Sequence, residues 1–200
     1  MNEVKFIGSP ECSVGNGVLA TLCGKTFFFT SAHVVRKLSS ISVDSFDIPI
    51  EEKNIYYTES IWTKILCVLF GWSKLGWLFH DFAVFECSTS KSELELASTL
   101  PVIGEVLTSH SIKLTSESVD SGLSIFSRQE KYVPYTTSAQ VVAIRGNFIF
   151  CKMDNMLEKG RSGSPLVKNG KVYGILRGGD DKSICWYESS VSIMKQLNLQ

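Results

Sequence analysis

Short apolar runs separated by glycine turns are the feature that most constrains how this chain can fold. The clearest turn is Asn169-Gly170, which lies between Leu166-Val167-Lys168 and Lys171-Val172-Tyr173. An Asn-Gly pair between two apolar runs predicts a two-residue β-hairpin, because both turn residues must adopt positive φ. The sequence therefore predicts that these two runs are adjacent antiparallel strands.

Further hairpins are predicted over 17–30 and over 141–152, where apolar runs flank glycine-containing turns. Helical periodicity occurs only in 191–197, which predicts one short terminal helix. Many short strands, repeated turns and a single helix favour an all-β protein built as a sandwich or barrel.

The length and one polar stretch predict how the chain divides. A chain of 200 residues can bury a sizeable core. The polar stretch 88–93 lies near the middle and predicts a linker between two β units of about equal size. We expect an N-terminal unit over 1–88, a linker over 89–100 and a C-terminal unit over 101–200.

Composition excludes several classes of protein. Lys plus Arg total 20, Asp plus Glu total 20 and 44 % of the residues are hydrophobic, so the chain is not of the disordered class. No excess of basic residues supports nucleic-acid binding through bulk charge, and none is expected. The six cysteines include no CxxC pair, and the N-terminus has no signal-peptide pattern. We therefore expect free thiols in a reducing, cytoplasmic compartment, with no metal and no cofactor.

The segment 61–79 is the most apolar stretch and contains three of the four tryptophans. Lys64 and Lys74 interrupt it, so it falls short of the 18 or more apolar residues of a spanning helix. We expect two buried strands joined by a turn. The alternative is a surface loop that contacts a membrane or a partner through its tryptophans.

Three segments carry residues suited to nucleophilic catalysis. They are Thr30-Ser31-Ala32-His33-Val34-Val35, His80-Asp81-Phe82-Ala83-Val84-Phe85 and Gly160-Arg161-Ser162-Gly163-Ser164-Pro165-Leu166. A serine hydroxyl needs a base, and histidine suits that role because its pKa lies near neutrality. A buried carboxylate can orient the histidine, and a glycine turn can aim backbone N–H groups at an oxyanion. The chain thus offers His33 as base, Asp81 as orienting acid and Ser162 as nucleophile.

Each of these residues also has an ordinary structural interpretation. His33 could be a core histidine, Asp81 a strand-edge acid and Ser162 a loop serine. His80 is the rival base, but it is disfavoured because neighbours on a strand point to opposite faces. His110 is interpreted as a structural or surface residue.

Together, the three segments resemble the trypsin-like, chymotrypsin-fold serine endopeptidases. In that family the base, the acid and the nucleophile occur in this order, the nucleophile within Gly-Asp-Ser-Gly-Gly-Pro. The resemblance covers nearly the whole chain and implies two six-stranded antiparallel β-barrels with the active site between them. It implies catalytic roles for His33, Asp81 and Ser162. It also places the oxyanion hole at Gly160, Arg161 and Ser162, with the N–H groups of Gly160 and Ser162 as donors.

The departures from the family pattern narrow the comparison. Arg161 stands where secreted members carry Asp, and the chain has no Ile-Val-Gly-Gly-type N-terminus. This argues against a secreted zymogen and leaves open what holds the oxyanion loop. A compact, signal-less version of the fold resembles the 3C-like polyprotein-processing proteases of positive-strand RNA viruses.

For the substrate pocket, the resemblance leaves open which P1 side chain is bound. It implies that Arg177, Gly178 and Gly179 pair with the substrate backbone as an added strand. Leu176 stands where many 3C-like proteases carry a histidine that reads a P1 glutamine, and Leu157 replaces an assisting threonine. These two residues favour an apolar P1, whereas Gln200 at the end of the chain fits a glutamine cleavage product, so both remain open.

The sequence therefore predicts a serine endopeptidase that cleaves a viral polyprotein through an acyl-enzyme. Its expected partner is a polypeptide substrate, with an activating cofactor peptide left open. The expected location is the host cytoplasm, with membrane association within a larger polyprotein as a further option. The alternatives are a cellular HtrA-like housekeeping protease and a catalytically silent binding module with a protease fold.

Overall fold

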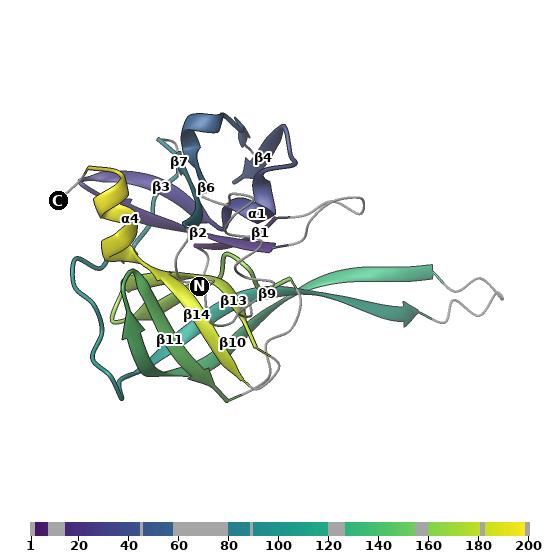
Figure 1. The fold of residues 1–200 in the computed structure, drawn as a ribbon. Helices are drawn as coiled ribbons and strands as arrows, with labels where there is room; N and C mark the ends of the chain where they lie inside the picture. Colours follow the sequence, from purple (N-terminus) through teal and green to yellow (C-terminus); the bar gives the residue numbers. More distant parts are fainter. Residues whose placement is uncertain are drawn as a thin grey trace, which may run out of the picture.

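The computed structural model describes residues 3–7, 15–44, 46–57, 80–88, 90–119, 127–154, 160–180 and 183–198. The first half contains β1 (Val4–Ile7), β2 (Gly15–Leu22), β3 (Lys25–Thr30), β4 (Ser40–Val43), β5 (Phe46–Pro49), β6 (Ile55–Tyr57), β7 (Asp81–Glu86) and β8 (Glu95–Leu96), with the short helices α1 (Ala32–Val35) and η1 (Glu52–Asn54). The second half contains β9 (Val106–Val119), β10 (Ser127–Arg145), β11 (Phe148–Met153), β12 (Pro165–Lys168), β13 (Lys171–Gly179), β14 (Ile184–Ser189) and the helix α4 (Ser190–Gln196). The all-β prediction is confirmed, and the two halves lie against each other (Figure 1).

The C-terminal half is a closed barrel of six strands. The strand order is β12-β9-β10-β11-β14-β13, and β13 pairs back with β12. Its interior is filled by buried apolar side chains such as Leu107, Ile149 and Leu176. Beyond the barrel, β9 and β10 continue as a long hairpin that projects from the body (Figure 1).

The N-terminal half is less complete than the resemblance implies. Its sheet runs β1-β2-β3-β7-β6, and β4 and β5 form a separate hairpin. The hairpin still joins the core, since Ile41 and Val43 pack with Phe28 and Phe85. Among the described residues, no strand pairing closes this half into a second six-stranded barrel, and segment 61–79 lies outside them.

Local turn chemistry explains the predicted hairpins. Asn169 and Gly170 have φ of 50° and 74°, and Lys168 pairs with Lys171 across them, which confirms the hairpin. The hairpins β2–β3 and β10–β11 also form where they were predicted. The terminal helix is confirmed at 190–196, where the Ser189 side chain caps it by accepting from the Ser192 N–H.

The stretch 89–100 contains β8, which lies between the two halves. Glu95 pairs with Thr21 of β2 and also with Lys171 of β13, both in parallel. Strand β8 therefore joins the strands of the two halves into one continuous sheet. No helix in the described part of the chain is long and apolar enough to cross a membrane.

Candidate active site

His33 and Asp81 form a two-point contact. His33 lies in α1, directly after β3, and Asp81 is the first residue of β7. The His33 N–H donates to Asp81 Oδ1 at 2.8 Å, and His33 Nδ1 lies 2.6 Å from Asp81 Oδ2. Asp81 is 5 % exposed, whereas the His33 side chain is 34 % exposed. The carboxylate thus fixes the imidazole through Nδ1, which leaves Nε2 as the nitrogen that can accept a proton.

Ser162 lies in a tight turn held by backbone hydrogen bonds. The Ser164 N–H donates to the Arg161 carbonyl at 3.0 Å, and the Gly163 N–H donates to the Leu176 carbonyl at 2.7 Å. Gly163 has φ of 86°, and a Cβ there would lie 1.8 Å from the Asn16 carbonyl oxygen. Only glycine fits this position, which explains the Ser-Gly pair in sequence.

One backbone carbonyl connects the histidine segment to the serine turn. The Leu176 carbonyl accepts from Ser31 Oγ at 2.8 Å as well as from the Gly163 N–H. Ser31 lies two residues before His33, and Gly163 directly follows Ser162. The structure therefore brings the three residues predicted from sequence to the junction between the two halves.

Asn16 holds the stretch 160–162, and sequence reasoning missed it. Its side chain is fully buried, and Nδ2 donates to the Gly160 carbonyl at 2.8 Å while Oδ1 accepts from the Ile112 N–H at 2.7 Å. Its backbone N–H also donates to the Ser162 carbonyl at 2.7 Å. One side chain and one peptide group thus fix both ends of the stretch 160–162.

Arg161 is the second unexpected feature of this loop. The side chain is 1 % exposed, and its guanidinium lies 4.9 Å from the centre of the Tyr135 ring. Nη2 reaches Ser109 Oγ at 3.5 Å, while Nε and Nη1 have no hydrogen-bond partner among the described residues. The residue that replaces the family's Asp is therefore a buried cation packed on an aromatic ring.

His80, the rival base, is engaged at both ring nitrogens. Nδ1 lies 2.5 Å from Glu188 Oε1, and Nε2 lies 3.0 Å from Gln196 Nε2. This arrangement leaves neither nitrogen directed to Ser162. His110 lies on β9, where burial lowers its pKa, and contacts Thr136 Oγ1 at 3.3 Å.

The predicted substrate-binding residues differ in how they are placed. Leu157 lies outside the described residues. The Leu176 side chain is fully buried in the barrel core, so it offers no surface to a ligand, and only its carbonyl contacts Ser31 and Gly163 at the junction between the two halves. Gly178 and Gly179 pair with β14 on one edge, Arg177 lies at an irregularity in that pairing, and no other described strand pairs with residues 177–179. Their second edge fits the predicted addition of a substrate strand.

Three of the four described cysteines are poorly suited to act as nucleophiles. Burial raises the pKa of Cys87 to about 11 and that of Cys185 to about 12. Burial also raises the pKa of Cys151, and all three cysteines are free and buried. Within the described ranges, no group of three or more His, Cys, Asp or Glu side chains could hold a metal ion.

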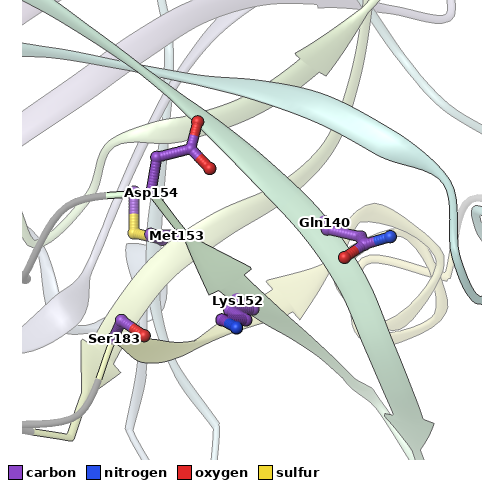
Figure 2. A pocket seen from close by; sticks show the side chains of 5 residues that line it. All are labelled: Gln140, Lys152, Met153, Asp154 and Ser183. Atoms are coloured by element: carbon purple, nitrogen blue, oxygen red, sulfur yellow. The ribbon is translucent and has the colours of Figure 1, made fainter.

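A separate hollow of about 430 Å³ lies on the C-terminal half. Figure 2 shows its lining: Gln140, Lys152, Met153, Asp154 and Ser183. None of these belongs to the candidate triad. The hollow is therefore distinct from the candidate active site.

Comparisons with known proteins place the fold. No family model and no curated protein matches the sequence. Among solved structures, mouse neuropsin, a serine protease, matches with a TM-score of 0.64 and 15 % identity. The match covers 98 % of this chain and 93 % of that chain. The equine arteritis virus NSP4 proteinase matches with a TM-score of 0.52 and 13 % identity, and the match covers 96 % of this chain and 74 % of that chain. The tobacco vein mottling virus protease matches with a TM-score of 0.51 and 12 % identity, and the match covers 94 % of this chain and 76 % of that chain.

An inactivated protease paralogue of the scabies mite also matches, with a TM-score of 0.60, 14 % identity, 98 % of this chain and 91 % of that chain covered. These identities support a shared fold and not a shared activity. Both viral and animal proteases, and one inactivated relative of them, have the same architecture. The chain therefore has the chymotrypsin-like fold of the trypsin-like serine proteases.

Proposed function

We propose that the protein is a serine endopeptidase that uses Ser162, His33 and Asp81. The observation that carries the proposal is the two-point contact of Asp81 with the His33 backbone and ring, next to the turn that presents Ser162. The His33 side chain is 34 % exposed, and Asp81 contacts its ring through Nδ1 and not through Nε2. The contact leaves Nε2 available for proton transfer.

The mechanism follows from these contacts. Ser162 Oγ attacks the scissile carbonyl while His33 Nε2 takes its proton, and Asp81 stabilises the imidazolium that results. The N–H groups of Gly160 and Ser162 donate to the oxyanion of the tetrahedral intermediate. His33 then protonates the leaving amine, and water releases the acyl group from Ser162.

The polypeptide substrate binds as an extended strand against 177–179. The second edge of this stretch, which no described strand occupies, supports the assignment. The burial of Leu176 removes one candidate for reading the P1 side chain, and P1 glutamine and apolar P1 both stay within the proposal.

The finer proposal is cleavage of a viral polyprotein in the host cytoplasm. The viral proteases among the structural neighbours and the replacement of the zymogen Asp by Arg161 support it. An HtrA-like housekeeping protease would use the same site on other substrates. Cleavage of a P1-specific set of peptides favours the viral assignment over the broad cleavage expected of a housekeeping enzyme.

A peptide-library cleavage profile tests the proposal. We expect the wild type to cleave a restricted set of sequences and Ser162→Ala to cleave none. Ser164→Ala is the matched control, because Ser164 lies in the same turn and its buried Oγ has no hydrogen-bond partner among the described residues. Absence of wild-type cleavage across the library, or cleavage that survives Ser162→Ala, would overturn the proposal in favour of a silent binding module.

A further inference from the structure

A second buried carboxylate lies directly behind the candidate triad. Glu188 of β14 is 1 % exposed. Its Oε2 accepts from the Asp81 N–H at 3.0 Å, and its Oε1 contacts His80 Nδ1 at 2.5 Å. Ser192 Oγ adds a longer contact to Oε1 at 3.4 Å. Glu188 thus binds two successive residues, His80 and Asp81, and Asp81 is the orienting acid of the proposed triad.

The contacts of Glu188 with His80 and Asp81 join the two halves. His33 and Asp81 belong to the N-terminal half, whereas Ser162 belongs to the C-terminal barrel, as does Glu188. Catalysis requires the two sets to keep their relative position, and a misplacement of about 1 Å can cost about a hundredfold in rate. Glu188 is suited to this task because it ties the Asp81 backbone to the barrel that carries Ser162.

The position of Asp81 in the chain makes such a tie important. Asp81 is the first residue of β7, so its N–H lies at the end of the strand where the regular ladder begins. β6 is its neighbour through the pair Tyr57–Asp81. The Glu188 carboxylate accepts from the N–H of Asp81 and fixes the start of the strand.

The hydrogen-bond chemistry of the unit is consistent with a fixed geometry. A carboxylate only accepts, so His80 donates from Nδ1, and its Nε2 can accept from the Gln196 amide of α4. A buried carboxylate needs such donors, because leaving one charge without partners would be strongly destabilising. The chain Gln196–His80–Glu188 thereby connects the terminal helix to Asp81.

We propose that Glu188 is a positioning residue, which places the Asp81 carboxylate against His33 and acts on catalysis only through Asp81. The proposal rests on the proposed function, because it assigns a role within the same triad. It assigns no proton transfer to Glu188 or His80. Both residues act by holding the start of β7.

The rate of labelling of Ser162 by a fluorophosphonate measures the effect. We expect Glu188→Ala to slow labelling about tenfold or more, since the Asp81 N–H loses its acceptor on the barrel and only the contact of Arg177 Nε with Asp81 Oδ2 at 3.4 Å still joins Asp81 to it. Glu188→Gln should restore the rate to within about threefold, because its amide oxygen can still accept from the Asp81 N–H. Ser192→Ala should also stay within about threefold, because Ser192 touches the same carboxylate but not Asp81. Circular dichroism and thermal melting establish that each variant is folded.

A double-mutant cycle separates positioning from a general loss of structure. In an Asp81→Ala background no carboxylate remains to be placed, so adding Glu188→Ala should change the slow residual rate by less than about threefold. An equal slowing in both backgrounds, or no slowing in the wild-type background, overturns the inference. If the wild type itself is not labelled, the proposed function fails instead, so the two failures are distinct.

Discussion

Asn16 is the residue on which the shape of the proposed oxyanion loop, residues 160–162, depends most directly. Substituting it with alanine removes the hydrogen bonds to the Gly160 carbonyl and to the Ile112 N–H, which are 2.8 Å and 2.7 Å long. The site is fully buried, so water cannot easily replace the lost partners. Both the stability of the fold and the placement of Gly160 should suffer.

The structure gives a magnitude for this loss. Each buried hydrogen bond contributes about 1 kcal/mol net, and each group left without a partner costs about 1–3 kcal/mol. A weaker third contact, from Nδ2 to the Ile112 carbonyl at 3.3 Å, is also lost. We therefore expect Asn16→Ala to lower the free energy of unfolding by about 2–4 kcal/mol, a large share of the total for a domain of this size.

Urea unfolding followed by tryptophan fluorescence measures the change. Asn16→Asp sharpens the test, because it keeps the acceptor for Ile112 but sets a second oxygen against the Gly160 carbonyl. It should be at least as destabilising as the alanine variant and should slow labelling of Ser162. A loss below about 1 kcal/mol for Asn16→Ala, with an unchanged labelling rate, would show that the Asn16 hydrogen bonds do not fix the stretch 160–162.

Three further predictions concern the loop and the thiols. Arg161→Met should leave the urea midpoint unchanged or raise it, because a buried guanidinium without a charged partner is often matched by an apolar side chain; a loss of more than about 2 kcal/mol would contradict this. Gly163→Ala should abolish labelling of Ser162 and destabilise the fold, since its Cβ would lie 1.8 Å from a carbonyl oxygen; retained labelling would show that the turn has another shape. A maleimide at pH 8, mapped by mass spectrometry, should modify exposed Cys23 and spare the three buried thiols until the protein unfolds, because their raised pKa values keep them protonated. Modification of those three in the native state would contradict the packing. They are Cys87, Cys151 and Cys185.

Features fixed by neighbouring residues were predictable from sequence. The Asn169-Gly170 hairpin follows from turn chemistry, and the terminal helix follows from periodicity and the Ser189 cap. The proximity of the His33 segment, Asp81 and the Ser162 turn was predictable because these residue types and their order are restrictive in combination. The contact of His33 with Asp81 spans 48 residues, yet both residues occur in recognisable local patterns.

Features fixed by distant contacts were not predictable. Asn16 lies in Gly15-Asn16-Gly17, a pattern typical of an exposed turn, but its partners are 96 and 144 residues away. Glu188 gave no signal for the same reason, since its contacts with His80 and Asp81 cross between the two halves. A buried polar residue in an apolar strand was the available signal for both, because such groups need partners.

Arg161 shows a different limit. A charged residue beside a catalytic serine is expected at the surface, and the family comparison offered only the missing Asp. The structure places the guanidinium on the Tyr135 ring instead. A long apolar stem and a planar cation let arginine fill such a site, which a sequence pattern does not reveal.

The most direct test of the central claim is the site of covalent modification by a fluorophosphonate, mapped by mass spectrometry. We predict one adduct, on the peptide that contains Ser162, with labelling lost in Ser162→Ala and strongly slowed in His33→Ala. An adduct on any other residue, or no adduct on the folded wild-type protein, would contradict the assignment of Ser162 as the nucleophile.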